Sequence, residues 1–343
     1  MSDIKAILNK YSAPVDNTIK AMLAETPEFM RGVINYHFGW VDQSFAPANF
    51  DRGKMFRPTM SLLVFEALTG EYRAALPVAA SIEMIHNFSL LHDDIEDNDV
   101  ERRGRPTAWK IWGKPLIINV GDYLYSLAYK ALYQLDANQF APESLFTVFR
   151  LINETCLALT QGQDLDLRFE TLETVSTEMY VDMVYKKTGA LVEAAILSGA
   201  ILGTSDKAIL DNYYQFARNI GIAFQIQDDI LGIWGDSDQT GKSSDNDLYR
   251  KKKTLPIIYM LEKAEGSRRA ELQTLYTRSE SLLPEEVAFI RDSLAWTEAR
   301  PYTQAIAEAY REKAFRALQS LNLQHQAHTE LEQLAKFLID RTY

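Results

Sequence analysis

Two short acidic segments hold the residues best suited to chemistry. In the first, Asp93, Asp94 and Asp97 form a D-D-x-x-D cluster at the end of an apolar run that begins near Ala74. Asp93 and Asp97 are four residues apart and would lie on one face of a helix, where their charges repel unless a cation lies between them. Mg²⁺ is bound in this way, by one or two carboxylates completed by water and phosphate oxygens. The alternative is a solvated acidic helix end, which is disfavoured because acidic residues prefer the other end of a helix.

The second acidic segment repeats this pattern. Asp228 and Asp229 form another adjacent pair at the end of an apolar helical stretch. We expect the two acidic helix ends to face each other across one cavity and to bind several Mg²⁺ ions with a diphosphate between them. The predicted metal ligands are therefore Asp93, Asp94, Asp97, Asp228 and Asp229.

Basic residues close to the first acidic segment are suited to bind phosphate groups. Lys54 and Arg57 are three residues apart, on neighbouring turns if they are helical, and a guanidinium group can bind phosphate oxygens through two hydrogen bonds. Arg102 and Arg103 are adjacent in the polar loop that follows the first cluster. Adjacent side chains in an extended loop point in different directions, so these two arginines can serve two anions. Taken alone, each pair also fits an ordinary solvated surface position.

Together these motifs resemble the trans-isoprenyl diphosphate synthases, the polyprenyl synthetase family, from about Gly53 to Pro256. The matching segments are a G-K-x-x-R-P element at 53–58, a K-T-G element at 187–189 and the two acidic motifs. The resemblance implies a Mg²⁺-dependent enzyme that condenses isopentenyl diphosphate with an allylic diphosphate. It implies a short-chain product of C15–C20, with C20 geranylgeranyl diphosphate favoured over C15, and a homodimer.

The resemblance also implies a role for each matching residue. It places the diphosphate of isopentenyl diphosphate at Lys54, Arg57, His86 and Arg103. It places the allylic diphosphate at Arg102, Lys187, Thr188, Gln225, Lys242 and Lys252. The catalytic residues that it implies are Asp93, Asp94, Asp97, Lys187 and Asp228, with Asp164 supporting the site indirectly as part of a G-Q-x-x-D element. The other bases near Lys252, which are Arg250, Lys251 and Lys253, are interpreted as a solvated loop.

Two positions depart from the family pattern. Gly232 stands where the third acid of the second motif is usual, and Met55 stands where many relatives have an arginine. Asp236 cannot simply replace the missing acid, because a continuous helix would place it roughly 12 Å along the axis from Asp228. The alternative is that Gly232 and Gly235 break the helix and fold Asp236 back. We expect weaker binding of Mg²⁺ at the second motif, with Asp228 still able to bridge metal and phosphate.

Phe88 and Ser89 are predicted to set the length of the product. Ser89 shares an i, i+4 row with Asp93 and Asp97, and Phe88 lies roughly 7.5 Å along the helix axis from Asp93, at a level that a growing prenyl chain must pass. In the family a bulky aromatic residue here restricts growth, and one aromatic followed by a small residue is typical of short-chain synthases. The alternative is that Phe88 is an ordinary core residue that faces away from the tunnel.

The elements that must position these residues are nearly all helices. Apolar residues recur at three- and four-residue spacing, with little strand-like alternation. Helices are predicted over about 74–97, 115–135, 142–169, 177–185, 190–202 and 206–233, with four or five more between 255 and 338. We see no repeat, low-complexity segment or linker. We therefore predict an all-α fold in a single domain over 1–343, a bundle of long helices around a central cavity of the isoprenoid synthase type.

Composition narrows the classes of function. The net charge of −11 disfavours nucleic acid as a partner, because nucleic acids attract basic surfaces. Cys156 is the single cysteine, which excludes a disulfide framework and fits a reducing compartment. The first ten residues are amphipathic, and apolar stretches such as 191–202 are too short or too polar to span a bilayer. We expect a soluble, cytoplasmic protein without a membrane span.

Two other functions fit part of the pattern. A class I terpene synthase shares the fold and the Mg²⁺ motifs but needs no second diphosphate site, so the basic residues predicted to bind isopentenyl diphosphate argue against it. A non-catalytic subunit of a heteromeric prenyl synthase is expected to lose acids from the first motif. This chain keeps all three of them.

Overall fold

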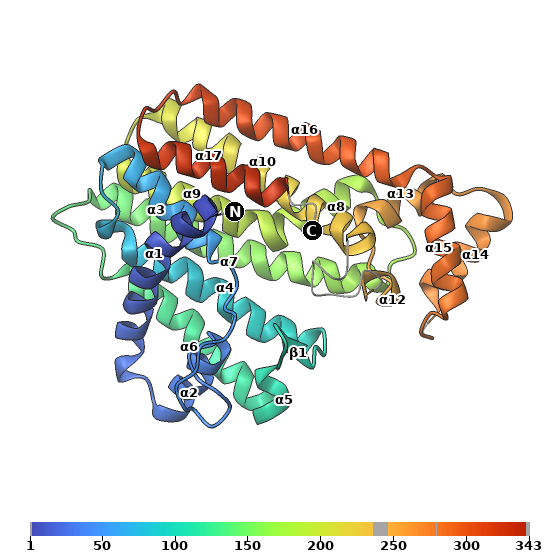
Figure 1. The fold of residues 1–343 in the computed structure, drawn as a ribbon, viewed down its shortest axis with the longest axis horizontal. Helices are drawn as coiled ribbons and strands as arrows, with labels where there is room; N and C mark the ends of the chain where they lie inside the picture. The colour runs from blue at the N-terminus through green and yellow to red at the C-terminus, as the bar shows by residue number, and fades with distance from the viewer. Residues whose placement is uncertain (1, 236–245, 279, 341–343) are drawn as a thin grey trace. The chain divides into compact units, whose positions relative to one another are not determined.

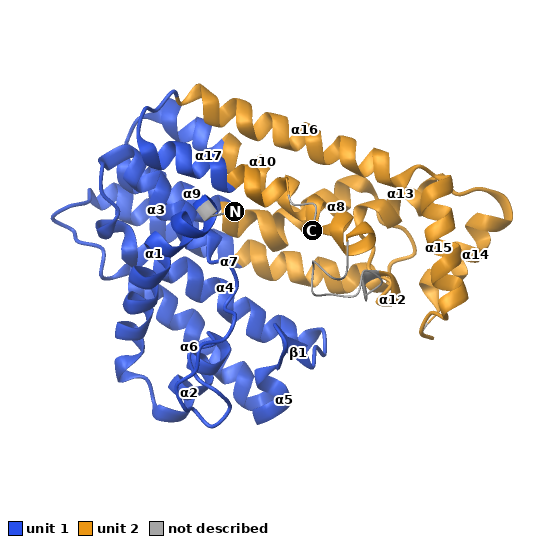
Figure 2. Cartoon of the chain, in the orientation of Figure 1, with its two compact units in different colours: residues 1–156, 193–214, 322–334 blue, residues 157–192, 215–321, 335–343 orange. Residues whose placement is uncertain are grey.

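The computed structural model describes residues 2–235, 246–278 and 280–340, and helices form almost all of the regular structure in these residues (Figure 1). The predicted all-α class is confirmed. Packing divides the chain into two compact units, which consist of residues 1–156, 193–214 and 322–334 and of residues 157–192, 215–321 and 335–343 (Figure 2). The boundaries fall within α7, α9, α10 and α17, so each of these helices has residues in both units. The single domain over 1–343 stays a prediction.

The predicted helices are present with ends that differ by at most a few residues. The helices observed in the first half of the chain are α1 Ser2–Met22, α2 Glu28–His37, α3 Phe56–Thr69, α4 Leu76–Glu96, α5 Ala108–Trp112, α6 Lys114–Leu132 and α7 Pro142–Thr171. Those of the second half are α8 Thr177–Val184, α9 Ala190–Gly203, α10 Lys207–Trp234, α12 Asn246–Tyr249, α13 Leu255–Lys263, α14 Gly266–Thr277, α15 Pro284–Trp296, α16 Ala299–Ser320 and α17 Gln326–Ile339. A π-helical turn, Tyr185–Gly189, joins α8 to α9.

In unit 1 the central element is α4. Every residue from Val78 to Ile85 is buried, and the helix packs against α1, α3 and α6. A helix that is apolar on all sides must lie inside a core. The stretch Arg73–Glu96 is apolar and long enough to cross a membrane, but 61% of its most apolar window is buried, as in the core helix of a soluble protein. The acidic motif lies where this buried helix reaches the surface and ends.

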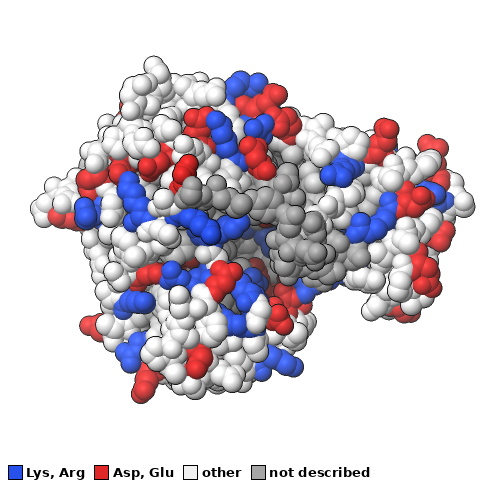
Figure 3. All heavy atoms as spheres, viewed as in Figure 1, with Lys and Arg blue, Asp and Glu red and all other residues white. Residues whose placement is uncertain are grey.

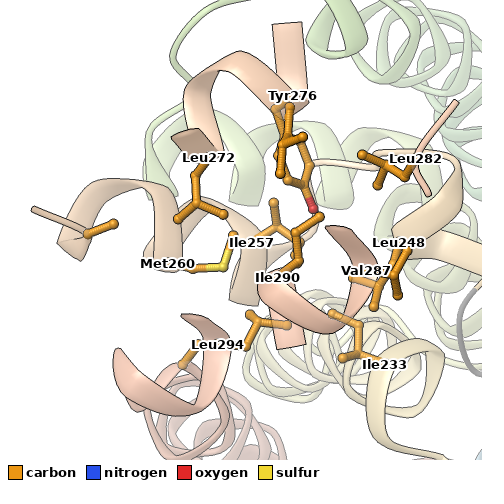
Figure 4. Close-up of a cluster of buried hydrophobic side chains, with 13 residues drawn as sticks. Ile233, Leu248, Ile257, Met260, Leu272, Tyr276, Leu282, Val287, Ile290 and Leu294 are labelled. Atoms are coloured by element: carbon orange, nitrogen blue, oxygen red, sulfur yellow. The ribbon is translucent and has the colours of Figure 1, made fainter. Parts of the chain in front are cut away.

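Unit 2 contains two apolar clusters. One is formed mainly by α13, α14 and α15, whose side chains converge on Ile257, Met260 and Ile290 (Figure 4). The other joins α8 to the C-terminal half of α10 through residues such as Tyr180, Met183 and Ile226. This second cluster fixes α8 and α10 together, and both helices carry residues of the candidate site.

Candidate active site

The first acidic motif separates into one buried carboxylate and two that are partly exposed. Asp94 is 2% exposed and turns into unit 1, where its Oδ1 accepts hydrogen bonds from Nε and Nη2 of Arg102 at 2.7 and 2.6 Å. Burial raises the pKa of Asp94, and the Arg102 guanidinium opposes this rise. Asp93 and Asp97 are only partly buried at the end of α4. All three acids were predicted to be metal ligands, whereas in the structure Asp94 binds Arg102.

Arg102 and Arg103 lie on a short β-hairpin that the sequence did not predict. Strand β1, Glu101–Arg102, pairs with β2, Arg105–Pro106, and the turn residues Arg103 and Gly104 have φ of +53° and +71°. Positive φ at both central residues is the geometry of a tight hairpin turn. The two arginines point in different directions, as expected: Arg102 binds Asp94, whereas the guanidinium of Arg103 covers Gly53 so closely that a Cβ there would lie 2.7 Å from its Nη2.

Arg57 and His86 meet where α3 packs against α4. Nη1 of Arg57 lies 3.3 Å from Nε2 of His86. Burial, followed by the positive charges of Arg57 and Arg103, holds the pKa of His86 well below its usual value, so the imidazole is neutral and can accept a hydrogen bond from Arg57. Lys54 is exposed just before α3. Four residues were expected at the diphosphate of isopentenyl diphosphate. Of these, Arg57, His86 and Arg103 lie close together in unit 1, and Lys54 is exposed beside them.

Glu83, which the sequence analysis did not single out, lies one turn before His86 on α4. It is 4% exposed, and its Oε1 accepts a hydrogen bond of 2.8 Å from the side chain of Asn87. Burial raises its pKa to about 7, against the lowering effects of Asn87, Arg57 and Arg103. Arg57 and Arg103 therefore lie close enough to act on the charge of Glu83, but they do not outweigh the effect of its burial. The sequence does contain a signal for Glu83, because it is a charged residue within an apolar helix.

A small pocket in unit 1 brings more cationic groups together. Its lining includes Asp94, Arg102, Arg103, Arg105 and the buried His37. Burial and then the three arginines hold the pKa of His37 well below its usual value. Neither His37 nor Arg105 was predicted from the sequence, because histidine and arginine outside a motif are usually structural. Three arginines and one carboxylate therefore make the lining of this small pocket electropositive.

In unit 2 the main charged group is Asp166 with two lysines. Nζ of Lys187 forms a short ion pair with Oδ2 of Asp166, and Nζ of Lys252 lies 4.0 Å from the same oxygen. Burial alone would raise the pKa of Asp166, but Lys187 and Lys252 outweigh it and hold the pKa below its usual value. A Cβ on Gly162 would lie 2.3 Å from the backbone nitrogen of Lys187, so only glycine allows α7 to approach the π-helical turn this closely.

Asp166, rather than Asp164, is the aspartate of this segment that contacts Lys187. Asp164 is exposed and lies 3.5 Å from Arg168, one turn further along α7. It therefore points away from Lys187. The spacing could have shown this, because Gly162 and Gln163 followed by Asp166 is the segment that satisfies G-Q-x-x-D.

The second acidic pair, like the first, consists of one buried and one partly buried aspartate. Asp229 is 6% exposed, and its two oxygens accept hydrogen bonds from the Tyr180 hydroxyl at 2.5 Å, from Gln225 Nε2 at 3.1 Å and from the backbone of Leu255 at 3.4 Å. Gln225 in turn accepts a hydrogen bond from Thr188 at 2.9 Å. Asp228, its neighbour, is only partly buried. The hydrogen bonds to both oxygens of Asp229 favour a positioning role over the predicted metal-binding one.

The loop after α10 is described only in part. Lys242 and Asp236 lie outside the described residues, and α10 continues through Gly232 to Trp234 without a break. The interpretation of Lys251 and Lys253 as solvated is wrong. Lys253 is 8% exposed, and the ammonium groups of both lysines bind backbone carbonyls.

No group of three or more His, Cys, Asp or Glu side chains in the described part of the chain is arranged to hold a metal ion. Mg²⁺ does not need such a group, because it usually keeps several waters and takes one or two carboxylates together with substrate phosphates. Asp93, Asp97 and Asp228 are partly exposed carboxylate residues and fit this donor set. Acidic and basic side chains are interspersed on the face seen in Figure 3, so the net negative charge does not form one continuous acidic surface there.

Phe88 faces α6 within unit 1. Its ring packs edge-to-face on Tyr125 with centroids 5.1 Å apart, and Tyr125 packs on Tyr129 at 5.3 Å. The hydroxyl of Ser89 donates to the carbonyl of His86. Phe88 therefore begins an aromatic row that continues along α6 through Tyr125 and Tyr129. The sequence analysis did not select Tyr125.

Replacing Glu83 with glutamine should stabilise the protein in a pH-dependent manner. The folded protein holds the Glu83 proton more tightly than the unfolded chain, so this group favours folding at low pH and loses that contribution as the pH rises from about 4.5 to 7. The advantage of Glu83→Gln in free energy of unfolding should grow to about 3 kcal/mol above pH 7. Denaturant unfolding between pH 5 and pH 8 measures it, with Glu271→Gln at an exposed position of α14 as the control. An advantage that does not change with pH would contradict the account.

Comparison with known proteins agrees with these features. Residues 40–292 match the family model described as polyprenyl synthetase. The chain is 32% identical over 326 residues to a (2E,6E)-farnesyl diphosphate synthase of Mycobacterium bovis, covering 94% of this chain and 89% of that protein. It is 40% identical to a geranylfarnesyl diphosphate synthase of Aeropyrum pernix, covering 76% of this chain and 81% of that one. The structure of a polyprenyl synthetase from Streptomyces coelicolor A3(2) superposes with a TM-score of 0.89 at 33% identity, covering 98% of this chain and 99% of that one. The chain therefore belongs to the polyprenyl synthetase family and is a prenyltransferase.

Proposed function

We propose that this protein is a Mg²⁺-dependent short-chain trans-prenyl diphosphate synthase that condenses isopentenyl diphosphate with an allylic diphosphate. The observation that carries the proposal is that the two aspartates of each acidic pair differ in their surroundings. One aspartate of each pair, Asp94 or Asp229, is held by donors of its own unit, and its neighbour, Asp93 or Asp228, is partly exposed. Farnesyl and geranylfarnesyl diphosphate synthases are among the proteins that the chain resembles.

Isopentenyl diphosphate binds at the basic group of unit 1 in this proposal. Lys54, Arg57 and Arg103 supply positive charge, and neutral His86 orients Arg57 through the contact of 3.3 Å. Charge-assisted hydrogen bonds to phosphate are about twice as strong as neutral ones. The positive charges of Arg57 and Arg103 lower the pKa of Glu83 but do not outweigh its burial, so Glu83 balances the two arginines only in part.

The allylic diphosphate binds at Arg102, Lys187 and Lys252, supported by Thr188 and Gln225, with Lys242 as a further predicted contact. Arg102 uses two of its five donor hydrogens on Asp94 and keeps others for phosphate oxygens. Lys187 and Lys252 are paired with Asp166, so their charges are in place before the substrate arrives.

Mg²⁺ would be held by Asp93, Asp97 and Asp228, while Asp94 and Asp229 position Arg102 and Gln225. When bound, Mg²⁺ supplies positive charge that stabilises the departing diphosphate. Gly232 leaves the second motif with fewer carboxylates than is usual in the family.

The reaction consists of breaking one bond and making another. The allylic C–O bond breaks and its electron pair leaves with the diphosphate, whose growing charge is stabilised by Arg102, Lys187 and Lys252. The double bond of isopentenyl diphosphate attacks the allylic cation and forms the new C–C bond. A proton then leaves the neighbouring carbon, and the departed diphosphate accepts it. Exclusion of water protects the cation until attack occurs.

We also propose that the protein forms a homodimer. Large apolar side chains on α6 and on the part of α7 that lies in unit 1 are exposed, among them Leu116, Ile118 and Phe146 at 47%, 44% and 69%. Tyr133, at the end of α6, stacks on Phe149 of α7 and is itself 73% exposed. Exposed large apolar side chains that gather in one patch mark association surfaces, and we propose that those on α6 and α7 belong to one. A second copy of the chain would cover them.

Incubation with Mg²⁺, isopentenyl diphosphate and allylic diphosphates of increasing length tests the function. The wild-type protein should make linear products longer by five-carbon units. Asp93→Asn should lower kcat by about a hundredfold or more, because it removes a carboxylate proposed to hold the Mg²⁺ whose positive charge stabilises the departing diphosphate. Asp164→Asn, at the exposed position paired with Arg168, is the matched control and should keep full activity.

Other outcomes of this incubation would contradict the proposal. A cyclic hydrocarbon formed without isopentenyl diphosphate would identify a terpene synthase. Activity that requires a second, different chain would identify a subunit of a heteromeric enzyme.

Phe88 should limit the length of the product, which we propose to be C20 geranylgeranyl diphosphate. Phe88→Ala should lengthen the main product by at least one five-carbon unit, because it removes the first ring of the aromatic row, and Ser89→Phe should shorten it. Tyr125→Phe keeps the ring that Phe88 contacts and should leave the product unchanged. Chromatography of the dephosphorylated products measures the effect. Unchanged products from active Phe88→Ala and Ser89→Phe enzymes would place the limit elsewhere.

A further inference from the structure

Residues 251–255, which we call the lysine segment, are fastened to three other parts of unit 2. The ammonium group of Lys253 donates to the carbonyl oxygens of Phe169, Glu170 and Leu172 at the C-terminal end of α7, with distances of 2.7 and 3.2 Å to the first two. The ammonium group of Lys251 donates to the carbonyls of Arg278 and Glu280 at 2.8 and 2.6 Å. The backbone N–H of Leu255 donates to Asp229 of α10 at 3.4 Å.

The contact of Lys253 with α7 is chemically well matched. The last carbonyl groups of a helix lack partners within the helix and lie at the negative end of its dipole. An ammonium group has three donor hydrogens and no acceptor, so three carbonyls satisfy it completely. Burial lowers the pKa of Lys253, and Glu170 opposes this effect. A lysine that is buried against three backbone oxygens is a fixed anchor rather than a solvated surface charge.

Lys252 lies between these two anchored lysines. Its Nζ is 4.0 Å from Asp166, a residue of the same helix whose end Lys253 caps. Lys251 adopts a left-handed backbone conformation with φ of +54°, which is uncommon for a residue with a side chain and persists where the surroundings hold it. The contacts of Lys251 and Lys253 therefore determine where Lys252 emerges.

We propose that Lys253, together with Lys251, is a positioning residue that fixes Lys252 at the allylic diphosphate site before substrate binds. The inference rests on the proposed function, in which Lys252 binds that diphosphate. A free lysine side chain must lose its mobility when it binds an anion, and this loss weakens binding. Anchors on both sides hold the backbone of Lys252 in place, so that less mobility is lost when its side chain binds the diphosphate.

A double-mutant cycle tests the proposal. Lys253→Met removes the ammonium group and keeps the length of the side chain. It should weaken binding of inorganic diphosphate with Mg²⁺, measured by calorimetry, by about tenfold, and raise KM for the allylic substrate by a similar factor. The KM for isopentenyl diphosphate should stay within about twofold. In a Lys252→Met background the same change should have almost no further effect, because a residue that acts through Lys252 has nothing left to position.

Two further variants complete the design. Lys253→Arg keeps donors for the carbonyls and should restore most of the affinity. Lys186→Met, which removes a lysine that pairs with Asp182 at the surface, is the matched control and should change neither affinity nor KM. If Lys253→Met does not fold, Lys251→Met carries the same cycle with Lys252→Met.

The possible results are distinct. A lowered Tm with unchanged diphosphate affinity would show that Lys253 only caps α7 and would overturn the proposal. The proposal would also be overturned if Lys253→Met lowered the affinity equally in the wild-type and the Lys252→Met backgrounds. Failure of the wild-type protein to elongate any allylic substrate would refute the proposed function, whereas the calorimetric cycle would still report whether Lys253 places Lys252.

Discussion

Removing a charged side chain from water costs several kcal/mol unless a partner of opposite charge or a set of hydrogen bonds replaces the water. This constraint organises the charged groups of both units. Asp94 is buried and is held by Arg102, and the half-buried Asp166 is paired with Lys187 and Lys252. Each partnership keeps a cation in a fixed place without a ligand. A protein that binds anionic diphosphates despite a net charge of −11 needs such local arrangements, because its overall field repels its substrates.

The helices provide the fixed places. The buried face of α4 ends at the acidic motif, so the partly exposed carboxylates of Asp93 and Asp97 follow a segment that cannot shift without breaking the core of unit 1. In unit 2 the π-helical turn carries Lys187 and Thr188, and Gly162 lets α7 approach its backbone. A side chain at Gly162 would push α7 away from Lys187 and separate the lysine from Asp166.

The sequence predicted the parts of this architecture that depend on local pattern. Apolar residues at helical spacing located α4, α7 and α10 to within a few residues, because α4 is buried on nearly all sides and α7 and α10 each bury an apolar stripe. The hairpin of Arg102 was missed, since two-residue strands have no periodicity. The separation of Asp94 from Asp93, and of Asp229 from Asp228, was also missed. Adjacent residues look alike in a sequence, whereas a helix turns them by about 100° towards different partners.

The central claim is that one aspartate of each pair positions cationic or polar groups while its neighbour binds metal. The most direct test is a crystal structure of the protein with Mg²⁺, isopentenyl diphosphate and an unreactive thio analogue of the allylic diphosphate. The account predicts Mg²⁺ on Asp93, Asp97 and Asp228, with Asp94 still bound to Arg102 and Asp229 still bound to Tyr180. Mg²⁺ coordinated directly by Asp94 or Asp229, with these hydrogen bonds broken, would contradict it.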